Sequence, residues 1–227
     1  MNKFIVRAAA VMAAAAISFS AVSCGSKKDE HEHDHNMVGI DTPDENMGLD
    51  DLGYGATQKD DTPENSDVPI GVTYDPRYMT QDEAAKVVDY FYSLSSRDTS
   101  RLENALYPPV LELDLGRVDM ESSQEFLDEM YDMYKETTGV EFEFTYVLVD
   151  DIIEDKEENS SEFAEYDDIL KKADPDANVT EKKIFMVNCV YKEKGGTGSK
   201  LLRKTSSGEH YLYAAVYTID GEPYVIA

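Results

Sequence analysis

The stretch Gly139-Val140-Glu141-Phe142-Glu143-Phe144-Thr145-Tyr146-Val147-Leu148-Val149 marks the point where this chain changes from helices to strands. Before it, apolar residues recur every three or four positions, which is the period of an amphipathic helix. Within it they alternate with polar residues, which is the period of a strand with one dry and one wet face. Helices followed by strands predict an α+β fold class.

Upstream of this stretch, capping signals and helical spacing predict three helices. Thr80 with Glu83 and Ser122 with Glu125 form capping boxes, in which side chains satisfy the free amides of a first turn. Asp98 can cap a shorter helix between them, which Pro108-Pro109 ends. Residues 110–118 fit neither period.

Downstream, the sequence predicts an acidic loop, one more helix and a series of strands. The loop covers residues 150–158 and the helix residues 163–173. The strands are expected over residues 179–192, 200–206, 209–219 and 224–227. Asp220-Gly221 is a strong hairpin signal before the last strand. We therefore expect one domain over residues 76–227, large enough to bury a single core.

Two short stretches give this order a family resemblance. They are Phe91-Tyr92-Ser93-Leu94-Ser95-Ser96-Arg97-Asp98 and the closing hairpin Ala214-Ala215-Val216-Tyr217-Thr218-Ile219-Asp220-Gly221-Glu222-Pro223-Tyr224-Val225-Ile226. The domain resembles the nuclear transport factor two-like (SnoaL-type) cone fold. The resemblance implies N-terminal helices packed on a curved antiparallel β-meander, although the helix at 163–173 is an insertion that the simplest members lack. Cystatin-like meanders remain an alternative.

The N-terminus, residues 1–23, has the layout of a secretory signal peptide. Lys3 and Arg7 precede an uncharged apolar run over residues 8–21, and the chain continues Ala21-Val22-Ser23-Cys24. As a helix this run of about 14 residues spans roughly 21 Å, which is short of the roughly 30 Å hydrocarbon core of a bilayer. An exported protein is the expectation.

The end of this leader resembles the lipobox of bacterial lipoproteins. The resemblance implies that Cys24 becomes the N-terminus and carries a diacylglycerol on its thiol, which holds the protein at the extracytoplasmic face of the cell membrane. The family most often has Leu where this chain has Ala21, and Gly25 leaves the inner, outer or sole membrane undecided. The alternatives are a secreted protein cut near Ala21 or Ser23, with Cys24 as a free thiol, and an uncleaved anchor helix.

The chain beyond this leader is strongly acidic. Loss of Lys3 and Arg7 leaves 19 basic and 47 acidic residues, a formal charge of −28. Such a field repels phosphate backbones, which excludes nucleic acid as a partner. Residues 24–75 are acidic, rich in Pro and Gly and poor in large apolar residues, so we expect a disordered tether. Cys189, within an apolar run, is expected to be buried.

The tether contains one candidate metal site. His31, His33 and His35 alternate with Glu32 and Asp34, and imidazole with carboxylate suits zinc, copper or nickel. A solvated polar stalk is the alternative. The sequence from Asp174 opens like a calcium loop, but Val179 and Phe185 stand where Gly and Glu are required. The acidic run over residues 150–158 most simply forms a solvated loop.

Catalytic constellations are sparse in the predicted domain. Asp98, Glu143 and His210 are the candidates that a cone fold could place in a cavity, but no serine elbow or phosphate-binding glycine loop accompanies them. We expect no cofactor and no enzyme, but a binding or protein-interaction module whose partner is an unidentified small molecule or protein. Tyr191, Tyr211, Tyr213 and Tyr217 share strand parity and could form an aromatic platform; an ordinary packed face is the alternative.

Overall fold

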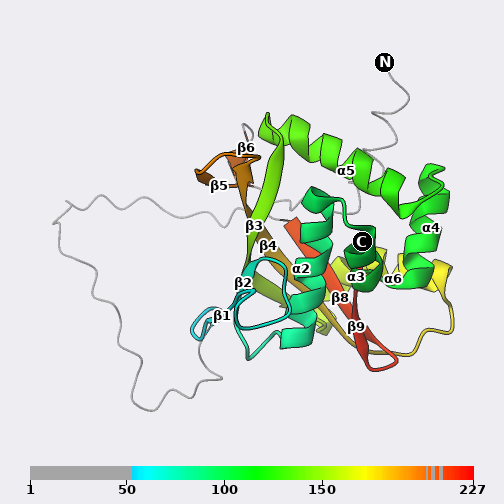
Figure 1. Cartoon of the computed structure of the whole chain (residues 1–227). Helices are drawn as coiled ribbons and strands as arrows, with labels where there is room; N and C mark the ends of the chain where they lie inside the picture. The colour runs from blue at the N-terminus through cyan, green and yellow to red at the C-terminus, as the bar shows by residue number, and fades with distance from the viewer. Residues whose placement is uncertain (1–52, 203, 206–207, 210–211) are drawn as a thin grey trace, which may run out of the picture.

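The domain combines five helices with a mostly antiparallel sheet (Figure 1). The computed structural model describes residues 53–202, 204–205, 208–209 and 212–227. The helical elements are α2 (Gln81–Ser96), α3 (Thr99–Ala105), α4 (Pro108–Val118), α5 (Ser123–Thr138), the short 3₁₀ helix η2 (Glu157–Asn159) and α6 (Ser160–Ala173). The strands are β1 (Lys59–Asp61), β2 (Gly71–Tyr74), β3 (Phe142–Glu154), β4 (Val179–Glu193), β5 (Ser199–Leu201), β6 (Lys204–Thr205), β7 (Gly208–Glu209), β8 (Leu212–Ile219) and β9 (Glu222–Ile226). The α+β class is confirmed.

The sheet is mixed and open. Its strand order is β1-β2-β3-β4-β8-β9, with β5 also paired to β4, while β6 and β7 form a separate pair. All neighbours are antiparallel except β2 and β3, where Gly71 lies opposite Tyr146. Helices α2 to α5 lie between β2 and β3 in the chain, and such a long crossover permits parallel pairing. The long strands β3 and β4 bend, which gives the sheet a curved surface (Figure 1).

The predicted capping signals start the helices. The Thr80 side chain accepts a hydrogen bond from the Glu83 amide, and the Glu83 side chain accepts one from the Thr80 amide, so the first capping box is complete. Ser122 caps α5, which ends at Gly139 with φ 73°. The ambiguous residues 110–118 belong to α4, because Pro108 at a first helical position starts a helix as well as ending the previous one.

Two apolar cores lie on opposite faces of the sheet. Helices α2 and α5 cover a face that carries Phe185 and Val216, whereas α6 covers the face that carries Ile184 and Tyr217. Cys189 is fully buried in the first core, as predicted.

Tyr191 and Tyr217 do not share a face, so the alternative of ordinary packing, rather than an aromatic platform, describes them. Phe185 pairs with Ala214 in the register of β4 and β8, so odd positions of β4 face the same side as even positions of β8. Tyr191 therefore lies in the first core and Tyr217 in the second. Tyr211 is outside the described residues.

Ordered structure reaches further toward the N-terminus than the expected boundary at residue 76. Strands β1 and β2 join the sheet, and Val72 and Tyr74 are buried in its core. The sequence obscures this contribution because its few apolar residues lie among acidic and turn-forming ones.

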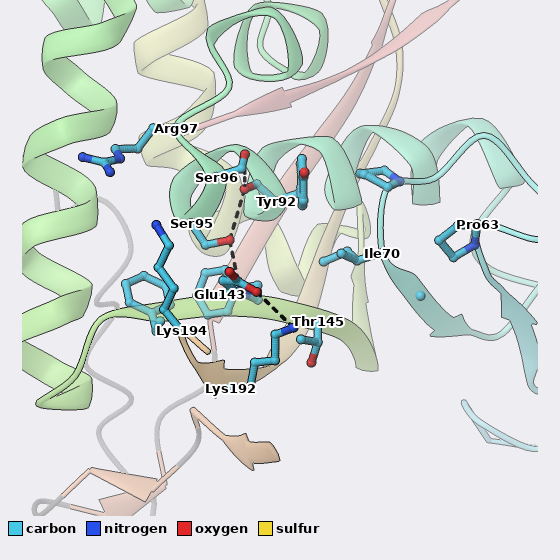
Figure 2. Close-up of a pocket in the computed structure, with 14 residues that line it drawn as sticks. Pro63, Ile70, Tyr92, Ser95, Ser96, Arg97, Glu143, Thr145, Lys192 and Lys194 are labelled. Atoms are coloured by element: carbon cyan, nitrogen blue, oxygen red, sulfur yellow. Dashed lines mark hydrogen bonds and ion pairs between the residues drawn. The ribbon is translucent and has the colours of Figure 1, made fainter. Parts of the chain in front are cut away.

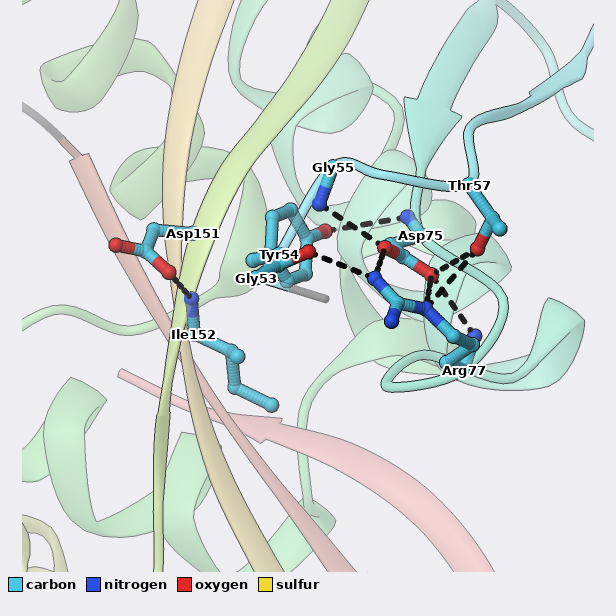
Figure 3. Close-up of polar contacts among 8 residues, drawn as sticks. All are labelled: Gly53, Tyr54, Gly55, Thr57, Asp75, Arg77, Asp151 and Ile152. Carbon is cyan, nitrogen blue, oxygen red and sulfur yellow. Dashed lines mark hydrogen bonds and ion pairs between the residues drawn. The ribbon is translucent and has the colours of Figure 1, made fainter. Parts of the chain in front are cut away.

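A buried carboxylate fastens this N-terminal segment (Figure 3). Asp75, with no exposed side-chain surface, accepts hydrogen bonds from the Gly55 amide at 2.9 Å and the Thr57 hydroxyl at 2.7 Å. It also pairs with the Arg77 guanidinium at 2.6 Å, and Arg77 in turn donates to the Gly53 carbonyl. These bonds hold the pKa of Asp75 well below its usual range. We call these residues the Asp75 clamp.

Two other details concern the region after β3. The strand runs on to Glu154, through the first half of the loop expected over residues 150–158. Helix α6 matches the helix predicted at 163–173 and begins three residues earlier. Within the described part of the chain, no helix is both long and apolar enough to cross a membrane.

Candidate functional site

Two hollows in the domain differ in size and chemistry. The larger, which we call the outer cleft, has a volume of about 520 Å³ and lies between the end of α2, the start of β3 and the segment before β2 (Figure 2). Its lining residues are Pro63, Pro69, Ile70, Gly71, Tyr92, Ser95, Ser96, Arg97, Phe142, Glu143, Phe144, Thr145, Lys192 and Lys194. This volume is within the range of small-molecule sites in proteins, roughly 300–1,000 Å³.

The end of α2 shapes one side of the outer cleft. Arg97 adopts the left-handed conformation, with φ 61°, and its amide donates to the Ser93 carbonyl at 2.7 Å. Ser95 joins the helix to the sheet, because its hydroxyl accepts a hydrogen bond of 3.1 Å from the Phe144 amide. The helix terminus is thereby held against the first residues of β3.

The opposite wall comes from the N-terminal segment. Pro63, Pro69 and Ile70 lie in the connection from β1 to β2, which the sheet and the Asp75 clamp hold in place. Gly71 must be glycine here, because a Cβ at this position would overlap the ring of Tyr146. The part of the chain expected to be a tether thus supplies a wall of the cleft.

The charged side chains of the outer cleft are mainly basic. Lys192 Nζ lies 3.1 Å from a carboxylate oxygen of Glu143, and both side chains are more than one third exposed. Lys194 shares this end of β4, and among the described residues its ammonium has no hydrogen bond or ion pair. Arg97 makes a 3.5 Å ion pair with the exposed Asp128 and lies over the ring of Tyr131 at 4.6 Å.

The smaller hollow, which we call the inner cavity, has a volume of about 80 Å³ and lies near the end of β9. Its lining is mostly apolar and aromatic: Tyr90, Phe91, Leu106, Leu111, Asp114, Phe126, Met130, Tyr134, Tyr166, Leu212, Tyr213, Ile226 and Ala227. Burial raises the pKa of Asp114 to about 6, although Arg117 at 3.1 Å opposes the shift. Burial also raises the pKa of Tyr166 to about 12.

The sequence-predicted site residues are scattered. Cys24, His31, His33, His35 and His210 lie outside the described residues. Asp98 caps α3 and accepts hydrogen bonds from the Ser100 and Arg101 amides. A hydrogen bond from the Ser100 hydroxyl, together with these two amide bonds, lowers the pKa of Asp98. Of the two catalytic candidates that the structure describes, Glu143 lines the outer cleft and Asp98 does not. No group of three His, Cys, Asp or Glu side chains in the described residues could hold a metal ion.

Sequence reasoning missed the residues that give both hollows their chemistry. Arg97 lies far from Lys192 and Lys194 in the chain, and only the folded domain brings the ends of α2 and β4 together. A weak signal existed, because basic residues are scarce in this acidic chain and two of them lie two positions apart at the end of a predicted strand. Asp114 gave no signal, since the period of its segment was ambiguous.

Comparisons of the chain with protein-family models, with curated proteins and with solved structures found no significant match.

Proposed function

We propose that this chain is a bacterial lipoprotein, anchored through Cys24 at the extracytoplasmic face of the cell membrane, whose domain binds a small molecule in the outer cleft. The observation that carries the binding role is the cleft itself. It is open, has a ligand-sized volume of about 520 Å³, and is walled by the connection between β1 and β2, whose two ends are held by strand pairing in the sheet. A fixed wall lowers the entropic cost of binding.

The lipid anchor rests on the sequence from Lys3 to Cys24. Intact mass and membrane partition of the wild type and of Cys24→Ser test it. We expect the wild type to partition with membranes and to carry acyl mass that Cys24→Ser lacks. Two soluble, unmodified proteins would overturn the anchor and leave a freely secreted protein.

The binding role is tested by blocking the cleft. Ser96 is exposed at the end of α2 and lines the cleft, so Ser96→Trp fills the space without removing a charge. Native mass spectrometry of the full chain, purified from its own membrane, is expected to show a bound small molecule that Ser96→Trp lacks. Equal spectra for the two proteins would overturn the assignment of the cleft.

The finer fold proposal is a divergent nuclear transport factor two-like cone. Helices that precede a curved sheet and a closing Asp220-Gly221 hairpin support it. The parallel pairing of β2 with β3 and the insertion of α6 are departures from the simple pattern. An experimental structure in which β3, β4 and β8 fail to curve around the helices would contradict this proposal.

The inner cavity supports a second candidate function, in a small-molecule enzyme of the cone type. A carboxyl whose pKa is raised to about 6 can exchange a proton near neutral pH, which suits general acid–base catalysis. The volume of about 80 Å³ admits only a small reacting group. The pH titration of the Asp114 carboxyl by carbon NMR is the test, since a midpoint near pH 4 would remove this candidate.

Divalent-metal capture by His31, His33 and His35 is a separate proposal for the tether. Zinc titration of the wild type and of a variant with alanine at all three positions tests it. Tighter binding by the wild type would support capture, and equal weak binding by both would exclude it.

A further inference from the structure

The charges that line the outer cleft are opposite in sign to those of the chain as a whole. The full sequence has a formal charge of −26, yet the cleft is lined by Arg97, Lys192 and Lys194 against a single carboxylate, Glu143. A concave site of one charge sign raises the local concentration of ions of the other sign. In this acidic chain the lining of the outer cleft is therefore locally basic.

Two of the three cations lack a close counter-ion. Both interact electrostatically with Glu141, whose carboxylate is paired with Lys135 at 2.9 Å. The Arg97 guanidinium also lies over the ring of Tyr131. The Lys194 ammonium has no hydrogen bond or ion pair within the described part of the chain. The bond from Arg97 to Asp128 is long, at 3.5 Å, and joins side chains 43% and 52% exposed, so it contributes little. In Figure 2 the Lys194 side chain extends toward the side of the cleft where Arg97 lies.

The third cation is held by its own counter-ion. Lys192 Nζ lies 3.1 Å from a carboxylate oxygen of Glu143, near the start of β3 (Figure 2). Glu143 therefore competes with any bound anion for Lys192. Removal of its charge should free Lys192 for the ligand.

The uncharged lining favours an organic anion rather than a bare inorganic ion. Pro63, Pro69, Ile70 and Tyr92 supply apolar surface beside the cations. Such walls stabilise a ligand in proportion to the apolar area that it buries. A compact molecule with an anionic head and an apolar body matches both features.

Main-chain hydrogen bonding at the edge of β3 disfavours a peptide ligand that would pair with β3 as an added strand. β2 pairs with β3 from Tyr146 onward, which leaves the preceding residues of β3 facing the cleft. The Phe144 amide on this edge is already bonded to the Ser95 hydroxyl at 3.1 Å. Strand addition depends on free main-chain groups, and α2 already occupies one of them.

We propose that the outer cleft binds a small organic anion, with Arg97 and Lys194 holding the anionic head and Glu143 limiting affinity by neutralising Lys192. This inference rests on the proposed function, because it names the ligand class of the same site. The two probes that test it are naphthalene-1-sulfonate and the neutral naphthalene-1-sulfonamide, which share an apolar body and differ in charge. Calorimetric titration of the full chain with each probe measures the difference.

The wild type is expected to bind the sulfonate roughly tenfold more tightly than the sulfonamide, because bonds to charged groups are stronger than neutral ones. Arg97→Gln and Lys194→Gln should each weaken sulfonate binding roughly tenfold. Lys171→Gln makes the same change of charge at an exposed position of α6, outside the cleft, and should leave affinity within about twofold. The affinity should also fall as salt is added.

Glu143→Gln distinguishes a site that selects anions from a site that binds any apolar molecule of this size. It should tighten sulfonate binding severalfold and leave sulfonamide binding unchanged, because Lys192 is released and a like charge is removed. Unchanged or weaker sulfonate binding by Glu143→Gln would overturn the role of Glu143.

The outcomes distinguish this inference from the proposed function. Equal binding of both probes, abolished by Ser96→Trp, would overturn the anion preference and leave the cleft as a binding site. Binding of neither probe, with no molecule copurified, would overturn both. Tighter binding of a hexaglutamate peptide than of the sulfonate would replace the small anion by an acidic peptide.

Discussion

The outer cleft and the inner cavity share helix α2 and lie beside the same sheet but differ in character. The cleft, about 520 Å³, is open and combines basic side chains with apolar walls, whereas the cavity, about 80 Å³, is mostly apolar with one carboxyl, that of Asp114. Helix α2 contributes to both, with Ser96 and Arg97 at its end lining the cleft and Tyr90 lining the cavity. One amphipathic element thus serves two environments.

The difference follows from what closes each hollow. Side chains of α4, α5 and α6 meet around the end of β9 and close the cavity, so its lining is desolvated. The cleft is instead bordered by the N-terminal segment, which reaches the sheet only through β1, β2 and the Asp75 clamp. Desolvation shifts the pKa of a group in the cavity, whereas the exposed cations of the cleft remain charged and accessible.

The largest expected effect on stability comes from Asp75→Ala, which disrupts the clamp of the N-terminal segment; that segment lines the cleft but not the cavity. The fully buried carboxylate bonds to Gly55, Thr57 and Arg77, and the substitution removes the negative charge that pairs with the Arg77 guanidinium at 2.6 Å. We expect a loss of about 3 kcal/mol in the free energy of unfolding at neutral pH, measured by urea denaturation.

The effect of Asp75 has a defined pH dependence. Its pKa is lower in the folded protein than in the unfolded chain, so its stabilisation is full above about pH 4 and falls as the pH drops toward the folded value. The difference between wild type and Asp75→Ala should therefore shrink in acid. Asp128→Ala, which breaks an exposed pair, should cost less than about 1 kcal/mol, and an equal cost for both variants would contradict the clamp.

Asp114→Asn tests the desolvated character of the inner cavity. Burial raises the pKa of Asp114 from 3.8 to about 6, so the folded protein favours the protonated carboxyl and loses stability as the pH rises through this interval. Asparagine removes that cost. Well above pH 6 we expect the variant to be more stable by up to about 2–3 kcal/mol, with little difference near pH 4, since the net pKa shift already includes the opposing effect of Arg117. A gain that does not depend on pH would show that the carboxyl is not desolvated.

The smallest expected effect on stability is that of Arg97→Gly, a variant in which ligand affinity and stability should change separately. Glycine relieves the left-handed backbone at φ 61°, which offsets the lost contacts with Asp128 and Tyr131. The free energy of unfolding should change by less than about 1 kcal/mol, while sulfonate affinity falls roughly tenfold. Asp220→Gly, at another left-handed position outside the cleft, is the matched control and should leave affinity unchanged.

Local signals in the sequence predicted the elements better than their assembly. The Thr80 and Ser122 caps and the Asp220-Gly221 hairpin lie where expected, because each depends on neighbours within a few residues. The contribution of Val72 and Tyr74 to the core was underestimated, because a short parallel strand beside Tyr146 depends on a partner some 70 residues away. Odd or even position in the sequence also did not predict that Tyr191 and Tyr217 lie on opposite faces of the sheet, because the pairing register of the two strands decides which positions share a face.

The candidate site was less predictable for the same reason. Glu143 was singled out as a carboxylate that a cavity could use, but its neighbours Arg97 and Lys194 come from other elements. Asp98, equally prominent in the sequence, caps a helix. A single chain shows which side chains can do chemistry, and the fold decides which of them meet.

The proposal that the outer cleft binds a small organic anion is tested most directly by mapping where such an anion binds. Naphthalene-1-sulfonate is titrated into the isotope-labelled full chain, and the amide chemical shifts are followed by NMR. We predict that the largest shifts fall on Ser96, Arg97 and Glu143 in the outer cleft. Shifts concentrated instead on Tyr90, Asp114 and Leu212, in the inner cavity, would contradict anion binding in the outer cleft.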